Sequence, residues 1–395
     1  MMKNVLSTTF FGLFLVWTGL SGAGDAPPHM ARVNAAADAL SAAGAAGFSM
    51  GIVNADGLAW SDSRGTAGAG RPMTADTVMN IASISKTLTG ASLMKLVEQG
   101  RLDLDRDIND YLDFSVVHPR FPDAPITTRQ LLTHTSGILD RGGFYSSELS
   151  YHPGGDNPMS LGEFAPAYFD PAGSLYDLAN YAEWAPGTRW SYSNTAYGLA
   201  GYLVEVLSGQ PLNEFSKAQF FTPLGMDATG WMLSEIDPEA HAQLFRWEDG
   251  EHVPQAWYGL ATWPDGGVRT SLNDLARWMT AMINGGAIGE TRVLAEDTFA
   301  AMFQPQFQPG MPLAGATFED YRHQGVSWIY PEPEHGLQTV GHSGSDPGVR
   351  TLFLFLPDPG LGAIVLVNTS SDEDAFYEAA DDLMTALLQA AVSKP

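Results

Sequence analysis

A serine and a lysine stand three residues apart in the stretch NIASISKTL, at Ser83 and Lys86. Side chains three residues apart share one face of a helix, so the lysine can reach the serine hydroxyl. Ser83 falls at the start of a helix expected over 83–99, where free backbone N–H groups favour developing negative charge. The pair therefore has the residue types of a serine nucleophile and its activating base. An N-cap serine with an outward-pointing lysine is the structural alternative, and this motif alone leaves the two about equal.

A second Ser-x-x-Lys pair, Ser92 and Lys95, lies in the same expected helix. The two serines are nine residues apart, which at 3.6 residues per turn is about half a rotation. At most one of the pairs can therefore face a given cleft. Because Ser92 falls in mid-helix, we expect it to face solvent and Ser83 to carry the chemistry.

Two further motifs offer the other groups that a serine nucleophile needs. Tyr192 and Asn194 stand in APGTRWSYSN, and a serine- and glycine-rich stretch, GHSGSDPG, spans 341–348. A tyrosine beside a lysine ammonium can have a lowered pKa and take the proton of the serine. An asparagine can bind a substrate carbonyl, and a glycine-rich strand edge can supply a backbone N–H to the oxyanion.

These motifs resemble those of the serine β-lactamase and penicillin-recognising enzyme superfamily, closest to its class C branch. That branch also includes D,D-peptidases, D-amino-acid peptidases and amidases, and family VIII carboxylesterases. The three motifs occur in the order of the family, and the stretches LLTHTSG at 131–137 and GGVRTSLNDLARWM at 266–279 are also similar to it. The resemblance covers roughly residues 50 to 370 and rests partly on a Ser-x-x-Lys motif whose acylation base is disputed.

The resemblance implies a role for each motif residue. Ser83 would be the acylated nucleophile, Lys86 would assist its deprotonation, and Tyr192 would be the other half of the base. Asn194 would bind a substrate amide carbonyl, and the backbone N–H groups of Ser83 and Ser345 would form the oxyanion hole. The remaining residues expected to bind substrate are His342, Ser343, Gly344 and Arg350.

The chain departs from the family pattern at His342, where typical class C β-lactamases carry lysine and the esterases often carry tryptophan. A histidine titrates at about pH 6.5 unless it is perturbed, so it would grip a substrate carboxylate less tightly. A dedicated β-lactamase is therefore disfavoured. Arg350 could bind a carboxylate at the pocket edge, although a surface arginine is slightly favoured. His134 could orient a catalytic group, but a satisfied structural histidine is favoured.

Residues near the start of the chain predict a helix followed by paired strands. The helix is expected over 31–46 and is ended by Gly47. A strand is expected over 48–53, and after the turn Asn54-Ala55-Asp56-Gly57 the segment 58–61 can pair back with it.

The end of the chain also predicts paired strands and a helix. Apolar runs at 351–356 and 361–367 flank the turn residues Asp358-Pro359-Gly360 and predict a hairpin. Carboxylates at 372–374 then suit the N-terminus of a helix. That helix carries an apolar stripe made of Phe376, Ala380, Leu383, Leu387 and Ala391.

Helical patterns dominate the middle of the chain, at 83–99, 194–207 and 271–283. Between them, the glycine-, proline- and aromatic-rich stretch 137–190 is expected to form the rim of a pocket. Its aromatic side chains could line an acyl-side pocket or form a core that holds the loop down. They are Phe144, Tyr145, Tyr151, Tyr168, Phe169, Tyr176 and Trp184.

The predicted fold class is α+β, an antiparallel sheet flanked by helices plus a mainly helical domain. The resemblance identifies this arrangement with the β-lactamase/transpeptidase fold. We expect an α/β sheet domain from 29–79 and 266–395, and a mainly helical domain with long active-site loops from 80–265. A cleft between two such domains is a natural ligand site.

Composition narrows the class of function and the location. The chain has 395 residues, a formal net charge of −25 and no cysteine, which excludes disulfides and a thiolate nucleophile and makes nucleic-acid binding unfavourable. The start of the chain has Lys3, an uncharged apolar run at 5–20 and small residues at 21–23. This pattern predicts a signal peptide over 1–23, and hence a periplasmic or secreted protein with no stable membrane span after cleavage.

The sequence therefore predicts an exported serine hydrolase that acts through an acyl-enzyme on an amide bond of a small peptide-like substrate, with D-amino-acid substrates among the candidates. This activity would be similar to that of a D,D-peptidase or amidase, and the expected partner is a small-molecule or short-peptide substrate. A family VIII-type carboxylesterase is the main alternative, followed by a β-lactamase or a catalytically inactive binding member. No cofactor or metal is implied. A zinc hydrolase would need clustered histidines, and a conventional α/β-hydrolase would need Gly-x-Ser-x-Gly, which 341–345 lacks.

Overall fold

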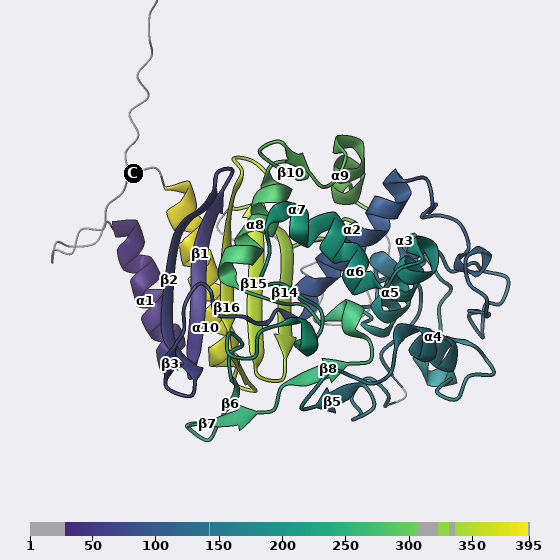
Figure 1. The fold of residues 1–395 in the computed structure, drawn as a ribbon, viewed down its shortest axis with the longest axis horizontal. Coiled ribbons are helices and arrows are strands. Elements are labelled where there is room, and N and C mark those ends of the chain that lie inside the picture. The colour runs from purple at the N-terminus through teal and green to yellow at the C-terminus, as the bar shows by residue number, and fades with distance from the viewer. Residues whose placement is uncertain (1–27, 142, 307–322, 332–335, 394–395) are drawn as a thin grey trace, which may run out of the picture.

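The protein consists of an antiparallel sheet with helices on both faces and a mainly helical region beside it (Figure 1). The computed structural model describes residues 28–141, 143–306, 323–331 and 336–393. The predicted signal peptide over 1–23 lies outside the described residues. Within those residues, no helix has both the length and the apolar character needed to span a bilayer.

The main sheet has eight strands in the order β12-β13-β14-β15-β16-β1-β2-β3, and each neighbouring pair is antiparallel. Strands from the two ends of the chain meet in its centre, where β1 pairs with β16 and Met50 lies opposite Val365. The strands are β1 (Gly47–Asn54), β2 (Gly57–Gly68), β3 (Arg71–Pro72), β12 (His323–Gln324), β13 (Ile329–Tyr330), β14 (Val340–Asp346), β15 (Val349–Leu356) and β16 (Leu361–Val367). The predicted α+β class, the early strand pair and the late hairpin are confirmed.

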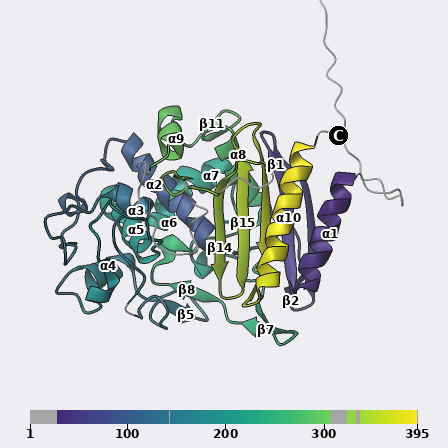
Figure 2. The same cartoon turned by 180° about the vertical axis from the view of Figure 1, so that it is seen from behind.

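Helices α1 (Pro28–Ala42) and α10 (Asp374–Val392) lie side by side on one face of the sheet (Figure 2). The predicted stripe of α10 packs there, with Phe376, Leu383 and Leu387 fully buried against strand residues such as Phe48. The predicted end of the first helix is wrong. Gly44, at φ +103°, already turns the chain out of α1, and Gly47 is the first residue of β1.

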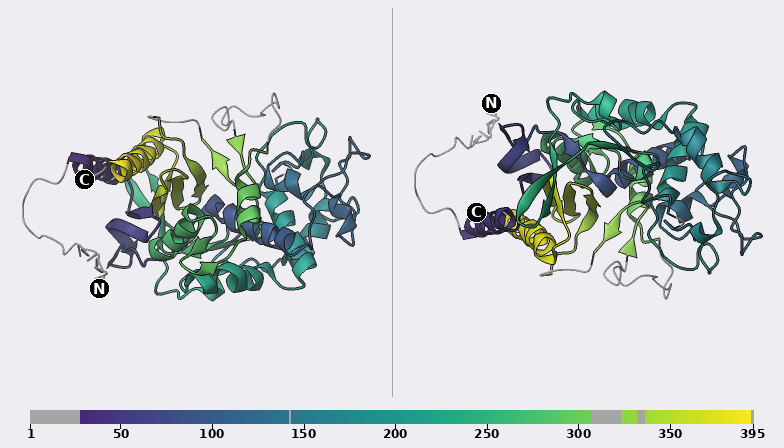
Figure 3. Two further views of the ribbon diagram at one scale, coloured as in Figure 1. Left: turned by 90° about the horizontal axis from the view of Figure 1, so that it is seen from above. Right: turned by 90° about the horizontal axis from the view of Figure 1, so that it is seen from below.

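Helix α8 (Leu272–Ile283) covers the opposite face, so that the sheet lies between α10 on one side and α8 on the other (Figure 3). The core on this side continues without a break into the helical region. One hydrophobic core therefore connects the sheet to the helices that carry the candidate nucleophile.

The helical region is built around α2 (Ser85–Glu98), which packs against α5 (Thr195–Ser208). Both helices were predicted, as was α8. The other helices are α3 (Thr128–Leu132), α4 (Leu161–Phe169), α6 (Leu212–Ser216), α7 (Thr222–Leu224) and α9 (Glu296–Phe303). Single turns are η1 (Ala82–Ile84), η2 (Ile108–Asp110), η3 (Leu178–Asn180), η4 (Lys217–Phe221), η5 (Leu233–Glu235) and η6 (Trp263–Asp265).

Short strands tie the helical region to the sheet. Strand β4 (Met79–Asn80) pairs with β9 (Arg269–Thr270), so the two ends of the segment 80–265 lie side by side. This pairing supports our proposal that the segment is an inserted domain. The other short strands are β5 (Tyr151–Pro153), β6 (Leu244–Glu248), β7 (Glu251–Gln255), β8 (Tyr258–Leu260), β10 (Ala287–Ile288), β11 (Thr291–Arg292) and β17 (Thr369–Ser371).

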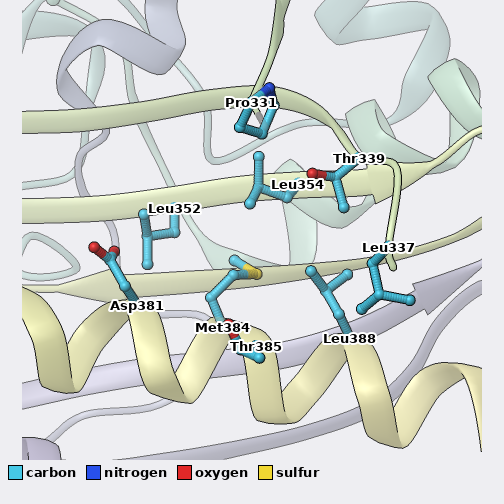
Figure 4. A pocket seen from close by; sticks show the side chains of 9 residues that line it. All are labelled: Pro331, Leu337, Thr339, Leu352, Leu354, Asp381, Met384, Thr385 and Leu388. Carbon is cyan, nitrogen blue, oxygen red and sulfur yellow. The ribbon is translucent and has the colours of Figure 1, made fainter. Parts of the chain in front are cut away.

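A small cavity of about 100 Å³ lies between β15 and α10 (Figure 4). Leu352 and Leu354 of β15 form one wall, and Met384 and Leu388 of α10 form the other. This is the α10 face of the sheet. The turn that carries Ser83 packs against the opposite face of β14, so the cavity is separate from the predicted site.

Candidate active site

Ser83 lies in η1, the single turn that leads directly into α2. The turn is held against the sheet, because the Thr351 hydroxyl donates a hydrogen bond to the Ile81 carbonyl at 2.9 Å. Gly344 of β14 lies so close that a Cβ there would be 2.6 Å from the same carbonyl oxygen. Ala82 has the left-handed φ of +46° that this close turn requires. Strand β14 and the nucleophile turn therefore position one another.

Two side chains converge on the Ser83 hydroxyl. Lys86 Nζ lies 3.0 Å from Ser83 Oγ, and the Tyr192 hydroxyl lies 2.8 Å from the same atom. Lys86 Nζ also sits 4.9 Å from the centre of the Tyr192 ring. The structure thus assembles three residues that were predicted from motifs about a hundred positions apart.

Lys86 is fully buried, and its Nζ contacts two further acceptors besides Ser83. Nζ donates to Asn194 Oδ1 at 2.7 Å and to the Asp265 carbonyl at 2.9 Å. A neutral amine has two hydrogens and one lone pair. Those two carbonyl-type acceptors can hold both hydrogens, which leaves the lone pair for the Ser83 proton.

Burial acts on Lys86 and Tyr192 in opposite directions. Desolvation lowers the pKa of Lys86, although Asp265, Asp140 and Asp346 partly offset the effect. Desolvation raises the pKa of Tyr192 well above its ordinary value. The expectation of a lowered tyrosine pKa is therefore wrong, because the cost of burying a phenolate outweighs the nearby lysine. Lys86 is the better proton acceptor, and Tyr192 stays a phenol that donates to Ser83.

The second Ser-x-x-Lys pair has no such surroundings. Ser92 is buried, not solvent-facing as expected, and its hydroxyl donates to the Leu88 carbonyl of its own helix at 2.8 Å. Lys95 forms an ion pair with Glu98 at 2.5 Å. The expectation for Ser92 failed because α2 is surrounded by other elements, so its back face is also covered.

Asn194 immediately precedes α5 and lies between Lys86 and a carboxylate that the sequence analysis did not identify. Its Oδ1 accepts from Lys86, and its Nδ2 donates to Asp140 Oδ2 at 2.9 Å. Asp140 follows the THTSG stretch, so its position beside a recognised motif was the available signal.

His342 lies on β14, and its ring centre is 6.4 Å from that of Tyr192. Its side chain is only 4% exposed, and Nδ1 lies 2.6 Å from the Ser343 carbonyl. Burial and the charge of Lys86 lower the pKa of His342 to about 3. The expected titration of His342 near neutrality is therefore wrong, and the imidazole is neutral at physiological pH.

Ser345 and Arg350 lie opposite each other in the β14–β15 pair, and both side chains reach α10. Ser345 Oγ is 3.4 Å from the Tyr377 hydroxyl, and Arg350 forms an ion pair with Asp381 at 2.6 Å. Side chains alternate along a strand, so Ser343 and Ser345 point away from the face that carries His342 and Gly344. Arg350 thus has an acidic partner on α10, and only the backbone of Ser345 remains a candidate for the oxyanion hole.

Two further carboxylates lie near Lys86, and the sequence analysis missed both. Asp265 is 1% exposed with Oδ1 4.0 Å from Lys86 Nζ, and burial raises its pKa to about 7. Asp346 accepts from the Tyr151 hydroxyl at 2.7 Å, and burial raises its pKa to about 6. Each lies at the edge of a motif, in DGG and in SDPG, where an aspartate is usually attributed to a turn.

The aromatic residues of the rim are divided between the two expected roles. The Tyr145 hydroxyl lies 3.4 Å from Asp265 Oδ1 and 3.3 Å from the Tyr151 hydroxyl, so these two rings border the site. Others, Phe144, Tyr168 and Phe169, belong to the hydrophobic core.

His134 packs against the ring of Tyr192. Its ring lies 4.3 Å from the Tyr192 ring, and its Nδ1 accepts from the Ser193 N–H at 3.1 Å. Burial lowers the pKa of His134 well below its ordinary value. It is thus a neutral histidine that packs against Tyr192 and ties its backbone in place.

Two relatives are similar to this chain over most of its length. A penicillin-binding protein of Bacillus subtilis (strain 168) is 27% identical over 335 residues, covering 80% of this chain and 66% of that protein, just under two thirds. The D-alanyl-D-alanine-carboxypeptidase/endopeptidase AmpH of Escherichia coli (strain K12) is 26% identical over 326 residues, covering 81% of this chain and 78% of that protein.

Among solved structures, the D-amino acid amidase from Ochrobactrum anthropi SV3, complexed with L-phenylalanine amide, superimposes with a TM-score of 0.71. The alignment covers 91% of this chain and 99% of the amidase at 21% identity, so it establishes the shared fold. The sequence profile of the Beta-lactamase family matches residues 33–387. With nearly the whole chain matched, the protein belongs to the β-lactamase family.

Proposed function

We propose that this protein is an exported serine hydrolase that cleaves an amide bond of a small peptide-like substrate, with D-amino-acid amides among the candidates. The observation that carries the proposal is the convergence of Lys86 Nζ and the Tyr192 hydroxyl on Ser83 Oγ. A buried amine and a buried phenol on one serine hydroxyl can remove one proton and return another, as acyl transfer requires.

The reaction would proceed in two halves. In the first, Ser83 Oγ attacks the substrate carbonyl while its proton passes to neutral Lys86, and a tetrahedral oxyanion forms. The carbon–nitrogen bond then breaks, and the leaving nitrogen takes a proton from the Tyr192 hydroxyl, which is reprotonated by Lys86. In the second half, water attacks the acyl ester and gives its proton to Lys86. Ser83 Oγ then leaves with the proton of the Tyr192 hydroxyl, and Lys86 returns its proton to Tyr192.

The charges near Ser83 favour an uncharged or amine-bearing substrate over one with a carboxylate. The two groups expected to attract a carboxylate do not offer a free cation, since His342 is neutral and Arg350 is paired with Asp381. Asp265 and Asp346 lie close to Lys86 instead. An amide without a neighbouring carboxylate therefore fits the site better than the acidic C-terminus of a peptide or a β-lactam.

A family VIII-type carboxylesterase remains the second candidate. The same three residues can cleave an ester, and activated esters need little protonation of the leaving group. The Tyr192 hydroxyl favours amides, because an amine must be protonated to leave. Export to the periplasm or the medium is part of the proposal and rests on the pattern of residues 1–23.

The test is a comparison of substrates on wild type and Ser83→Ala. We expect hydrolysis of D-phenylalanine amide to exceed that of an N-acyl-D-Ala-D-Ala peptide, and benzylpenicillin to survive without a lasting adduct by intact-mass spectrometry. Efficient turnover of 4-nitrophenyl butyrate with no amide cleavage would favour the esterase. A stable penicillin adduct or rapid penicillin loss would overturn the charge argument.

A further inference from the structure

Asp140 is the most heavily hydrogen-bonded carboxylate around the site. Its Oδ2 accepts from the backbone N–H of Asn194 at 2.6 Å and from Asn194 Nδ2 at 2.9 Å. Its Oδ1 accepts from the N–H and the hydroxyl of Thr195, both at 2.9 Å, and from Ser193 Oγ at 3.2 Å. All five donors belong to three consecutive residues at the start of α5.

Asp140 caps the start of α5 from another loop, in addition to the local hydrogen bond that Ser193 Oγ accepts from the Ala196 N–H at 3.2 Å. Asn194 is the N-cap residue, but its own side chain makes no capping hydrogen bond. The side chain of an N-cap asparagine ordinarily accepts from the first N–H groups of its helix. Here the amide of Asn194 is free for Lys86, because the Ser193 hydroxyl accepts from the Ala196 N–H and the Asp140 carboxylate accepts from the N–H groups of Asn194 and Thr195. The charge also suits the positive end of the helix dipole.

The two ends of the Asn194 amide are chemically different, and Asp140 decides which one faces Lys86. Because Nδ2 donates to Asp140, Oδ1 must point the other way, toward Lys86 Nζ at 2.7 Å. A flipped amide would present hydrogens to the lysine. Those hydrogens would compete with the Ser83 hydroxyl for the lone pair of a neutral lysine.

We propose that Asp140 is a positioning residue that holds the Asn194 amide with its oxygen toward Lys86, so that the lysine lone pair is left for Ser83. The inference rests on the proposed function, since it takes Ser83 as nucleophile and Lys86 as proton acceptor. Asp140 touches neither of them and acts through Asn194 and through its charge.

The charge of Asp140 gives the test a readout that helix capping alone would not move. Its negative charge raises the pKa of Lys86 and also that of Asp265. Loss of that charge therefore lowers the pKa of both Lys86 and Asp265. The other titratable groups near Lys86 among the described residues are Asp346, Tyr192, Tyr197, His134 and His342.

The experiment measures kcat/KM for 4-nitrophenyl butyrate against pH in wild type, Asp140→Asn, Asn194→Ala and the double variant. Asp140→Asn should lower kcat about 10- to 100-fold, the effect of one lost charged hydrogen bond, with little change in KM. The acidic limb of its kcat/KM profile, which reports the apparent pKa of the proton acceptor, should move to lower pH by about one unit. In the Asn194→Ala background, the same change should cost less than about threefold, because residues acting through one contact are not additive.

Asp274→Asn is the matched control. Asp274 also accepts from a backbone N–H and a threonine hydroxyl, those of Ala228 and Thr229, but it contacts none of the site residues. It should lose stability and keep the wild-type pH profile. Additive effects of Asp140→Asn and Asn194→Ala, or an unmoved pH limb, would overturn the proposal.

Two more variants keep the outcome clear. If Asp140→Asn does not fold, Asp140→Glu keeps the charge and moves the oxygens, so kcat should fall while the pH limb stays in place. A simultaneous shift of that limb would contradict the proposal. If Ser83→Ala retains full turnover, the proposed function fails, whereas loss in Ser83→Ala with additive Asp140 effects rejects only the role of Asp140.

Discussion

Helix α2 and the turn before it carry the same Ser-x-x-Lys pattern twice, with opposite outcomes. At the first pair, Lys86 is fully buried and its Nζ contacts Ser83, Asn194 and the Asp265 carbonyl. At the second, the Ser92 hydroxyl bonds its own helix and Lys95 pairs with Glu98 near the surface. The spacing lets serine and lysine meet in either place. The first pair differs in its neighbours from η6 and from the segment before α5, which give it the surroundings that the proposed proton transfer needs.

The largest effect should come from Ser83→Ala, which removes the hydroxyl on which Lys86 and Tyr192 converge. Turnover should fall by at least about 10³-fold, since the proposed acyl-enzyme forms on the Ser83 hydroxyl. Steady-state assays together with intact-mass detection of an acyl adduct measure it. Retained turnover would mean that Ser83 and Lys86 are not the catalytic Ser-x-x-Lys pair.

Tyr192→Phe should have the next largest effect, because it leaves the leaving group without its proton donor. We expect kcat for an amide to fall about 10²- to 10³-fold and kcat for 4-nitrophenyl butyrate to fall less. Parallel kinetics on both substrates test this. A change confined to KM would remove Tyr192 from proton transfer.

His342→Gln tests whether burial near Lys86 keeps a titratable side chain neutral. Because His342 is held neutral with a pKa of about 3, the unfolded chain binds a proton below pH 6.5 that the native protein does not. Stability is therefore lost as pH falls from 6.5 toward 3. The variant should lose less stability over that range in thermal melts. An unchanged slope would show that His342 titrates normally in the folded protein.

Ser92→Ala should have the smallest effect. It removes a hydroxyl that only bonds a carbonyl of its own helix, and alanine is a better helix former. Activity should stay within about twofold, and the free energy of unfolding should change by about 1 kcal/mol or less. A loss of activity comparable to that of Ser83→Ala would break the distinction between the two pairs.

Most of the fold could be predicted from local sequence patterns. The hairpin of β15 and β16, the stripe of α10 and the starts of α2, α5 and α8 follow from apolar periodicity and turn residues. The end of α1 was placed too late, because Gly44 reverses the chain before the expected breaker Gly47. Helix ends depend on single residues and are the least reliable part of such a prediction.

Only part of the candidate site could be predicted from the sequence. Ser83, Lys86, Tyr192 and Asn194 stand in motifs, and the fold brings them together. The carboxylates Asp140, Asp265 and Asp346 were missed, because each stands in a stretch whose sequence is typical of a turn or loop, where an aspartate is usual. Their charges act on Lys86 from positions 54 to 260 residues away in sequence, which no local pattern records.

The sequence by itself determined the family, the fold class and the identity of the nucleophile motif, because these depend on residue types and on spacing along the chain. The tertiary structure alone decided the protonation chemistry. Burial makes His342 neutral, keeps Tyr192 a phenol and lowers the pKa of Lys86, whereas each would titrate near its ordinary value in water. Desolvation and the placement of charges are properties of the folded surroundings, so they could be derived only once those surroundings were known.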